Sequence, residues 1–317
     1  MDYINLYIIF LKKFLKPKRP VKIVFDSSNG TTGIILRKLF QGSNVNGQMS
    51  VVFLNDKPDG NFPAHGPNPL LKGATRQLEK EVMKLRRWDG APTAKRVGAD
   101  LGIIFDGDGD RVFFVDNLGR WIDANEIGYI LMQNFKPPYV VGAVSSWRLK
   151  NIRSCDDLNI SRTGHYFFKK LMRKKMANLG VEHSGHYYFK DFFYCDAGIF
   201  AAIVVLNFVS QLRGSLSDWL DELPGYYRSG EINFSAKGGP ASGWEEKMMK
   251  RIEKKYKKDA KKILKMDGLT MEFQNSAEFW FNLRPSNTED LLRLNMEATN
   301  EEVLKEKLRE LKKILKN

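Results

Sequence analysis

The sequence predicts an α/β protein, with two consecutive α/β domains followed by a small α+β domain at the carboxyl end. Two observations support this class. Segments rich in Val, Ile and Phe alternate with helical patterns over residues 21–222, and after "LPGYYRSGE" the order changes to a basic helix, strands and a final helix. A chain of 317 residues with 43% hydrophobic residues is also long enough for two or three hydrophobic cores.

Residues 1–20, "MDYINLYIIFLKKFLKPKRP", are predicted to form a linker helix. Aromatic residues recur at helical spacing, and Pro17 and Pro20 are expected to end the helix. The apolar stretch is too short to cross a bilayer, and it lacks a basic leader and a cleavage site. We therefore expect no membrane partner. The aromatic residues are Tyr3, Tyr7, Phe10 and Phe14.

The first α/β domain is predicted over residues 21–118. It begins with "VKIVFDSSNGTTGIILRKLF", which reads as a strand, a turn and a helix, and it is expected to contain a largely parallel sheet. Gly30 and Gly33 match a dinucleotide-binding fingerprint poorly, so we assign this turn no cofactor. Residues 86–97, "RRWDGAPTAKRV", are predicted to be a loop insertion.

Strand and helix patterns continue in the second domain, residues 119–225, where "YVVGAVSS" reads as a strand and "FAAIVVLNFVSQL" as a buried helix. The third domain, residues 226–317, contains three predicted strands and the helix "NEEVLKEKLRELKKIL". The three strands are "MDGLTMEF", "AEFWFNL" and "LLRLNMEA".

The chain is basic, with 51 Lys and Arg residues against 37 Asp and Glu residues. Much of the excess lies in Lys247–Lys265, where apolar residues recur at helical spacing. This pattern favours a solvated helix face, and a nucleic-acid-binding surface is the alternative. A basic field would also attract small anionic substrates. Cys155 and Cys195 form no CxxC motif, which indicates neither a disulfide framework nor a zinc site and fits a reducing cytoplasm.

The segment "LGIIFDGDGDRVFFVD" places Asp106, Asp108 and Asp110 in one turn between two apolar runs. Three carboxylates this close repel one another unless a cation lies between them. Oxygen ligands without Cys or His suit Mg²⁺, Mn²⁺ or Ca²⁺. Arg111 adds a fixed, planar cation that suits a phosphate beside the metal.

A polar turn without a bound ion and an EF-hand loop are the two alternative interpretations of this segment. A polar turn that binds no ion would use the same residue types. An EF-hand loop requires Gly at its sixth position and Glu at its twelfth, whereas Arg111 and Asn117 stand there, so a calcium sensor is disfavoured.

Two further stretches contain side chains suited to a sugar phosphate. In "VEHSGHYYF", Glu182 and Ser184 can bind vicinal hydroxyls, and His186 can contact a phosphate or move a proton. Tyr187–Phe189 are expected to be a packed strand. In "RPSNTEDLLRL", a cation, hydroxyls and an amide are gathered as in a phosphate-binding turn, although an ordinary polar turn is the alternative. The residues are Arg284, Ser286, Asn287 and Thr288, followed by Arg293.

These elements, in this order, resemble the α-D-phosphohexomutase superfamily, in particular its bacterial phosphomannomutase/phosphoglucomutase members. The matching stretches are "FDGDGDR", "SRTGHYFFKKLM", "VEHSGHYYF", "DAGI", "RPSNTEDLLRL" and "FPAHGPNP". The resemblance implies two phosphohexomutase-type α/β domains (II and III) and a C-terminal domain IV. It also implies interconversion of hexose 1-phosphate and hexose 6-phosphate, with mannose or glucose as the sugar, through a bisphosphate intermediate.

Site residues follow from the same resemblance. It implies Mg²⁺ on Asp106, Asp108 and Asp110, with Arg111 beside the moving phosphoryl group. Glu182 and Ser184 would read the sugar hydroxyls. The reacting phosphate would contact Arg162, His165 and His186, and the other phosphate would contact Arg284, Ser286, Asn287, Thr288 and Arg293.

The family's nucleophile is a phosphoserine in a Ser-His-Asn-Pro loop of a separate first domain, and no Ser-His dipeptide occurs in these 317 residues. We therefore expect substrate and metal binding but no activity by the chain alone. A gene fragment, a sugar-phosphate-binding pseudoenzyme and an enzyme completed by a separate N-terminal domain polypeptide all fit. Departures from the family pattern at Val181, Gly66 and Asp290 remove no proposed ligand.

Overall fold

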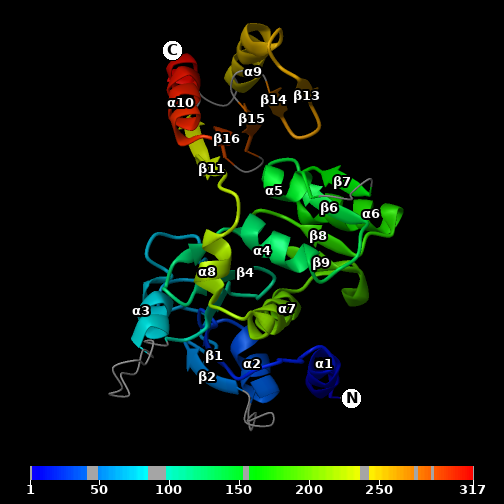
Figure 1. The fold of residues 1–317 in the computed structure, drawn as a ribbon, viewed down its shortest axis with the longest axis vertical. Helices are drawn as coiled ribbons and strands as arrows, with labels where there is room; N and C mark the ends of the chain where they lie inside the picture. The colour runs from blue at the N-terminus through cyan, green and yellow to red at the C-terminus, as the bar shows by residue number, and fades with distance from the viewer. Residues whose placement is uncertain are drawn as a thin grey trace. The chain divides into compact units, whose positions relative to one another are not determined.

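The computed structural model describes residues 2–40, 49–84, 98–152, 157–235, 243–274, 278–286 and 289–316. The chain divides into two compact units (Figure 1). Unit 1 comprises Met1–Val140, Ser154–Asn159 and Phe168–Leu223, and unit 2 comprises Val141–Arg153, Ile160–Phe167 and Pro224–Asn317. The predicted domain boundaries, 1–20, 21–118, 119–225 and 226–317, stay predictions.

The first sheet of unit 1 has the strand order β2-β1-β3-β4-β5. Its strands are β1 (Val21–Asp26), β2 (Met49–Leu54), β3 (Leu101–Phe105), β4 (Val112–Asp116) and β5 (Trp121–Ile122). Strand β1 runs parallel to β2 and β3, but the β3–β4 and β4–β5 pairs are antiparallel. The expectation of a largely parallel sheet is therefore wrong for the part of the sheet formed by β3, β4 and β5. The Asp-rich turn joins β3 directly to β4, and so short a connection can only pair antiparallel strands.

The helices of this region are α1 (Tyr3–Lys12), α2 (Thr32–Phe40) and α3 (Arg76–Lys84). The strand–turn–helix predicted after residue 20 is confirmed by β1 and α2. Helix α1 ends at Lys12, short of Pro17, because the following backbone bonds to side chains of helix α7 (Gly198–Gln211). The Lys16 N–H donates to Asn207 Oδ1 and the Lys18 N–H to Ser210 Oγ, both at 2.9 Å. The predicted insertion at 86–97 lies outside the described residues.

A second sheet has the strand order β10-β9-β8-β6-β7. Its strands are β6 (Tyr139–Gly142), β7 (Leu158–Ser161), β8 (Leu179–Val181), β9 (Tyr187–Phe189) and β10 (Cys195–Asp196). Its neighbouring helices in the chain are α4 (Ala124–Met132), α5 (Trp147–Lys150), α6 (His165–Lys175), α7 and α8 (Leu216–Asp221), with a short 3₁₀ helix at Lys190–Phe192. The predictions of a buried helix at α7 and a packed strand at Tyr187–Phe189 are confirmed.

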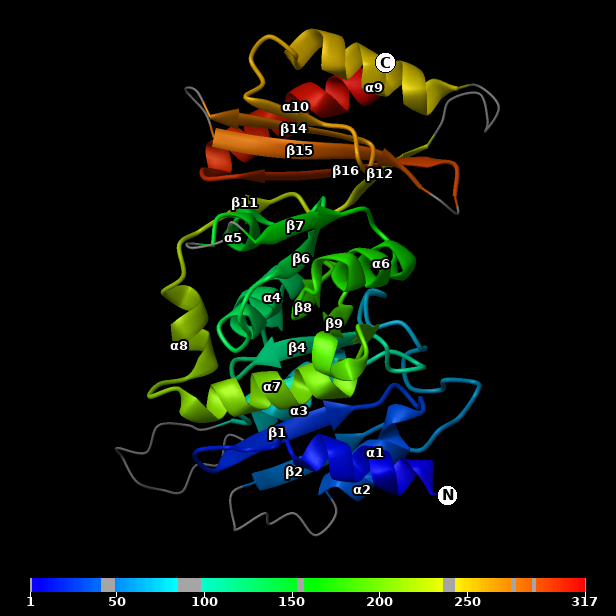
Figure 2. The ribbon, with the colours of Figure 1, turned by 90° about the vertical axis from the view of Figure 1, so that its right-hand side faces the viewer.

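Unit 2 contains a sheet of order β11-β16-β15-β14-β13, with β12 also paired to β16. Its strands are β11 (Tyr227–Arg228), β12 (Ile232–Ser235), β13 (Lys262–Leu264), β14 (Leu269–Gln274), β15 (Glu278–Pro285) and β16 (Leu291–Ala298). Helices α9 (Trp244–Tyr256) and α10 (Glu301–Lys316) cover one face of this sheet (Figure 2). Ile252, Leu304 and Leu311 from these helices share a core with Phe281 and Leu283. The three strands and the final helix predicted here are confirmed, and the helices on these sheets confirm the α/β class.

The basic segment Lys247–Lys265 is not one helix, contrary to the prediction. Helix α9 ends at Tyr256, and Lys262–Leu264 form strand β13. The Lys261 N–H donates to Glu272 O at 2.8 Å, and Ile263 packs against the core. Pairing with β14 thus outweighs the helical preference of the lysines.

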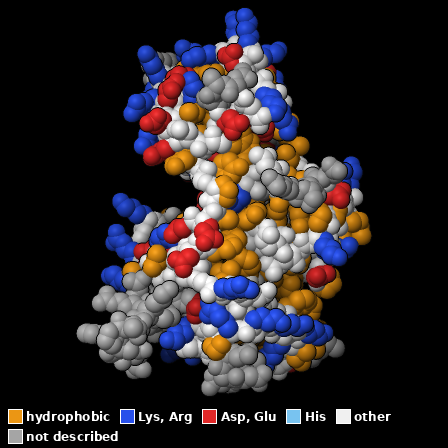
Figure 3. All heavy atoms as spheres, viewed as in Figure 1, with side chains coloured by type: hydrophobic (Ala, Val, Ile, Leu, Met, Phe, Trp, Pro, Cys, Tyr) orange, Lys and Arg blue, Asp and Glu red, His pale blue; other side chains and the backbone are white. Residues whose placement is uncertain are grey.

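Lysines of α9 and α10 are interspersed with carboxylates (Figure 3). Two pairs lie on the helices themselves, Lys250–Glu246 at 2.7 Å and Lys305–Glu301 at 2.7 Å. Lys265, which follows β13, pairs with Glu253 of α9 at 2.8 Å. This mixture is typical of a solvated helix face. No helix in the described part of the chain has both the length and the apolar character needed to cross a bilayer.

The turn after β1 packs directly against the turn after β3. The Thr31 N–H donates to the Gly107 carbonyl at 3.1 Å, and a Cβ added to Gly30 would overlap that same carbonyl oxygen. Only glycine therefore fits at residue 30 without moving the Asp-rich turn.

We expect Gly30→Ala to lower the midpoint of thermal unfolding by at least about 2 °C, because overpacking against backbone costs roughly 1–3 kcal/mol. Gly60→Ala is the matched control, since a Cβ there meets nothing within 4 Å. Melting curves by circular dichroism would measure both variants. Equal midpoints for the two would contradict the packing argument.

Candidate active site

Strand β3 ends at the three carboxylates. One oxygen from each of Asp106, Asp108 and Asp110 lies within 4.8 Å of the others. Asp106 is buried, and its Oδ1 accepts the N–H groups of Gly109 at 3.0 Å and Arg111 at 3.2 Å. Its Oδ2 accepts the Arg111 Nε–H at 2.6 Å. The turn thus supplies backbone donors and one guanidinium to hold like charges together.

The pKa values of Asp106 and Asp110 are shifted in opposite directions. Burial raises the pKa of Asp106 to about 6, against the opposing effect of the Arg111 guanidinium. The hydrogen bond from His186 lowers the pKa of Asp110 to about 2. A divalent cation among these oxygens would favour the charged form of each. Three carboxylates without sulfur or nitrogen donors fit a hard cation such as Mg²⁺.

A second group that could hold a metal shares one of these carboxylates. Asp110, His186 and Asp196 also offer ligand atoms within 4.8 Å of one another. Asp196, however, pairs with Lys169 Nζ at 3.0 Å, and an imidazole suits transition metals better than Mg²⁺. Asp196 is the first residue of the "DAGI" stretch and has no predicted role.

Backbone contacts fix the Asp-rich turn on two further sides. The Gly107 N–H donates to the Pro67 carbonyl at 3.0 Å, which gives the "FPAHGPNP" segment a supporting role. Gly109 has a φ of +79°, and a Cβ on Gly198 would lie 2.6 Å from its carbonyl oxygen. Helix α7 can therefore begin against this turn only with glycine at residue 198.

A backbone bridge joins the Asp-rich turn to the loop between β8 and β9. Arg111 and His186 form an isolated antiparallel bridge, and the Val112 N–H donates to Gly185 O at 3.1 Å. Gly185 has a φ of +90°, and its missing side chain leaves room for the ring of Phe113. The bridge sets His186 Nε2 3.3 Å from Asp110 Oδ2.

Side chains of the β8–β9 loop form a connected polar group. The Tyr188 hydroxyl donates to Glu182 Oε2 at 2.8 Å, and Ser184 Oγ lies 2.9 Å from His186 Nδ1. Burial opposes the charged form of His186, but the hydrogen bond to Asp110 and the charge of Glu182 outweigh it and raise the pKa. Burial, reinforced by Glu182, raises the pKa of Tyr188 and keeps it a donor. Glu182, Ser184 and His186 were predicted from the sequence as site residues, whereas the role of Tyr188 was not.

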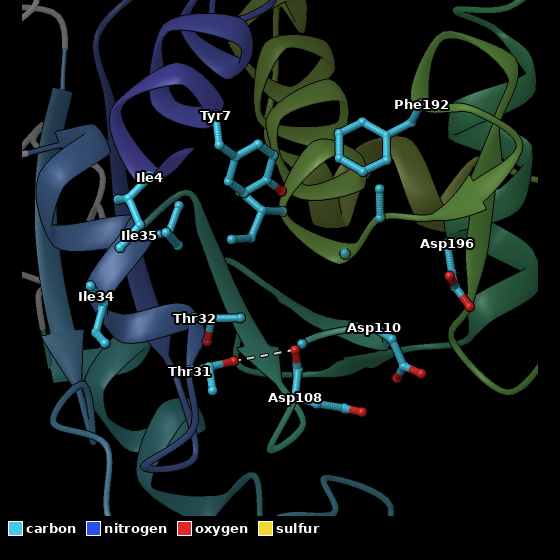
Figure 4. A pocket seen from close by; sticks show the side chains of 14 residues that line it. Ile4, Tyr7, Thr31, Thr32, Ile34, Ile35, Asp108, Asp110, Phe192 and Asp196 are labelled. Atoms are coloured by element: carbon cyan, nitrogen blue, oxygen red, sulfur yellow. Dashed lines mark hydrogen bonds between the residues drawn. The ribbon is translucent and has the colours of Figure 1, made fainter. Parts of the chain in front are cut away.

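A pocket of about 400 Å³ opens beside the Asp-rich turn. Figure 4 shows the rings of Tyr7 and Phe192 on one side and the carboxylates of Asp108 and Asp110 on the other. The Thr31 hydroxyl donates to the Asp108 carbonyl at 3.3 Å, as the dashed line in Figure 4 marks. The outer carboxylates thus face open space large enough for a small ligand.

Arg162 and His165 lie in unit 2, where both are exposed, near the start of α6. Their loop is tied to the C-terminal sheet, because the N–H and hydroxyl of Thr163 donate to Asp267 Oδ2 at 3.0 and 2.7 Å. The next residue, Gly268, has a φ of +72°, and its added Cβ would lie 2.7 Å from the Cα of Arg284. The contact between Thr163 and Asp267 could not be predicted from sequence spacing, because the two are 104 residues apart.

The phosphate-binding turn predicted from "RPSNTEDLLRL" joins β15 to β16. Arg284 and Arg293 are paired residues of these strands, and both contact Glu231. The Ser286 N–H donates to Leu291 O at 2.8 Å. Asn287 and Thr288 lie outside the described residues. Glu231 lies 53 residues before Arg284, so local sequence patterns do not predict that it joins this cluster.

The predicted site residues therefore fall into two groups. Unit 1 brings together the Asp-rich turn and the β8–β9 loop. Unit 2 contains the loop before α6 and the described part of the β15–β16 turn. The unit 1 residues are Asp106, Asp108, Asp110, Arg111, Glu182, Ser184 and His186, and those of unit 2 are Arg162, His165, Arg284, Ser286 and Arg293.

Comparison with known proteins assigns three consecutive domain families. Residues 3–119 match phosphoglucomutase/phosphomannomutase alpha/beta/alpha domain II, residues 123–227 match alpha/beta/alpha domain III, and residues 231–313 match the C-terminal domain. The chain is 36% identical to a phosphomannomutase of Methanocaldococcus jannaschii, over 98% of the chain and 66% of that protein. It is 33% identical to an Escherichia coli phosphomannomutase, over 92% of the chain and 61% of that protein.

Solved structures share the fold. A phosphoglucomutase/phosphomannomutase family protein of Burkholderia thailandensis superposes with a TM-score of 0.78 at 25% identity, over 99% of this chain and 64% of that one. The chain thus spans about two thirds or less of the length of these relatives. With its motifs, its sheets and these matches in agreement, the chain belongs to the phosphoglucomutase/phosphomannomutase family, of which it contains domains II, III and the C-terminal domain.

Proposed function

We propose that these 317 residues form the metal-, sugar- and phosphate-binding parts of a phosphohexomutase. The proposed reaction interconverts hexose 1-phosphate and hexose 6-phosphate through a bisphosphate. One observation carries the proposal: the Arg111–His186 bridge joins three carboxylates and a guanidinium to a polar loop that can bind a sugar. The relatives named phosphomannomutase support the same reaction class.

The Asp-rich turn would hold the metal of this reaction. Asp106, Asp108 and Asp110 would bind Mg²⁺, which when bound neutralises charge on a phosphoryl group in transfer. Arg111 is fixed by Asp106 and adds a second, permanent positive charge. A N-acetylphosphoglucosamine mutase of Aspergillus fumigatus, which shares this fold at 14% identity, was solved with GlcNAc-6P and magnesium.

The β8–β9 loop would bind and orient the sugar. Glu182 and Ser184 would exchange hydrogen bonds with vicinal hydroxyls. The hydrogen bond from the Tyr188 hydroxyl to Glu182 Oε2 supports this role, because it orients the carboxylate. His186 lies between Asp110 and Ser184, so it can hold a proton taken from the reacting hydroxyl. Close placement of an acceptor beside an oriented hydroxyl is a major part of catalysis of phosphoryl transfer.

The residues of unit 2 would bind the phosphate groups. Arg284, Ser286 and Arg293, with Asn287 and Thr288, are proposed to hold the non-reacting phosphate, and Arg162 and His165 to contact the reacting one. Paired guanidinium groups suit a phosphate because each offers a planar fork of donors. The Thr163–Asp267 contact would keep the Arg162 loop beside the turn that abuts Arg284.

The phosphoryl donor is proposed to come from outside these 317 residues. They contain no Ser-His dipeptide, and the family motif that carries the phosphoserine includes one. A separate polypeptide or another part of the same protein could supply it. A cytoplasmic location and a partner set without nucleic acid complete the proposal. The ion-paired lysines Lys250 of α9 and Lys305 of α10 favour a solvated helix face over a nucleic-acid-binding surface.

Loss of one carboxylate should weaken metal binding. We expect Asp108→Asn to reduce Mg²⁺ affinity by at least about tenfold. Mutation of a residue that only hydrogen-bonds to a metal ligand lowers affinity roughly 10–100-fold, and loss of a ligand itself should cost no less. Calorimetry of Mg²⁺ binding would measure this. Asp196→Asn is the control, since it tests the rival group and should leave the affinity nearly unchanged. The reverse pattern would move the metal to Asp110, His186 and Asp196.

Loss of one guanidinium should weaken phosphate binding. Arg284→Ala is expected to cost roughly 1.5–3 kcal/mol of glucose 1-phosphate binding, about 10–150-fold in Kd, because a charged hydrogen-bond partner is removed. Arg251→Ala, an exposed residue of α9, is the matched control. An unchanged Kd for Arg284→Ala in titration calorimetry would refute the assignment of this turn.

The 317-residue chain alone should show no mutase turnover, even with glucose 1,6-bisphosphate added, because its sequence lacks the Ser-His motif of the family's phosphoryl donor. Adding a family first domain that bears the phosphoserine should produce activity. A coupled assay on protein free of host mutase would decide. Robust turnover by the isolated chain would reveal a nucleophile that we have not identified.

A further inference from the structure

Glu231 has no role in the proposed reaction, yet it contacts two of the proposed phosphate-binding arginines. We propose that Glu231 is an internal counter-ion of the phosphate site, which a substrate phosphate displaces and which returns when the phosphate leaves. This inference rests on the proposed phosphate-binding function of Arg284 and Arg293. It adds a residue that governs how tightly the phosphate is held and how readily it exchanges.

Glu231 bridges the two arginines. Its Oε2 lies 3.2 Å from Arg284 Nη2, and its Oε1 lies 3.1 Å from Arg293 Nη1. Each oxygen thus meets a different guanidinium, as two oxygens of one phosphate group would. The carboxylate therefore stands in the position that a bridging phosphate would take.

Both arginines keep donor capacity beyond these contacts. The Nε–H groups of Arg284 and Arg293 are buried and have no hydrogen-bond partner among the described residues. The Arg284 side chain is only 7% exposed, so water compensates its Nε poorly. A phosphate has more acceptor oxygens than a carboxylate, and could satisfy donors that Glu231 leaves unpaired.

The local charge balance also favours exchange. Arg293 additionally pairs with Glu289 at 2.9 Å, so two guanidinium groups face two carboxylates. A phosphate monoester carries a charge of about −1.5 to −2 at pH 7, and it competes well with one carboxylate. The two arginines would otherwise repel each other whenever the phosphate left.

Glu231 is placed to move aside. It directly precedes β12, and its side chain is 27% exposed, more than that of Arg284 at 7% or Arg293 at 21%. Solvation would stabilise the displaced carboxylate. In a reaction whose bisphosphate must turn over, a returning internal anion would keep the phosphate from binding too tightly to leave.

The test compares Glu231→Gln with wild type. Glutamine keeps the size and one acceptor but removes the charge, so we expect glucose 1-phosphate and inorganic phosphate to bind about fivefold more tightly, mainly through slower dissociation. Calorimetry would give Kd, and stopped-flow displacement the dissociation rate. Glu289→Gln is the matched control and should change Kd by less than about twofold, because Glu289 contacts one arginine and is 59% exposed.

The outcomes separate this inference from the proposed function. Unchanged or weaker binding by Glu231→Gln, in a chain whose binding still depends on Arg284, would overturn the counter-ion role alone and leave the phosphate site standing. Binding by neither wild type nor Glu231→Gln would overturn both. Tightening that persists in the Glu231→Gln/Arg284→Ala double variant would place the phosphate elsewhere and also overturn both.

Discussion

Asp106, Asp108 and Asp110 lie in one turn, and three like charges at that spacing repel one another unless other groups hold them in place. The structure supplies those groups from four segments. Arg111 and backbone N–H groups bind Asp106, the turn after β1 and the Pro67 carbonyl hold Gly107, and the start of α7 closes over Gly109. Much of unit 1 is therefore arranged around this turn, and its glycines lie where backbones approach closely.

The same constraint, with the signs reversed, governs the β15–β16 turn. Arg284 and Arg293 lie opposite each other on neighbouring strands, and Glu231 brings an opposite charge from the start of β12. Each of these two turns thus gathers side chains of like charge. Each also contains an internal partner, His186 for Asp110 and Glu231 for the arginines, that limits repulsion.

Much of the fold and many of the candidate site residues could be predicted from local sequence. The Asp-rich turn, the β8–β9 loop and the strands of the C-terminal sheet are short, strongly patterned segments. The antiparallel pairing of β3 with β4 and the end of helix α9 at Tyr256 were mispredicted. Both depend on pairing between strands, of β3 with β4 and of β13 with β14. Thr163, Asp267 and Glu231 could not be found, because their roles depend on contacts between segments distant in the chain. A single sequence carries no periodicity or spacing for such contacts.

The division into compact units has a consequence for how the protein can be dissected. The chain passes between the units at five points: after Val140, Arg153, Asn159, Phe167 and Leu223. Cleavage of one peptide bond, such as that between Leu223 and Pro224, would therefore leave strands β6 and β7 connecting the two units covalently. Neither unit corresponds to an uninterrupted stretch of gene, so any single junction in a truncation library or a domain-swapped hybrid would divide at least one of them.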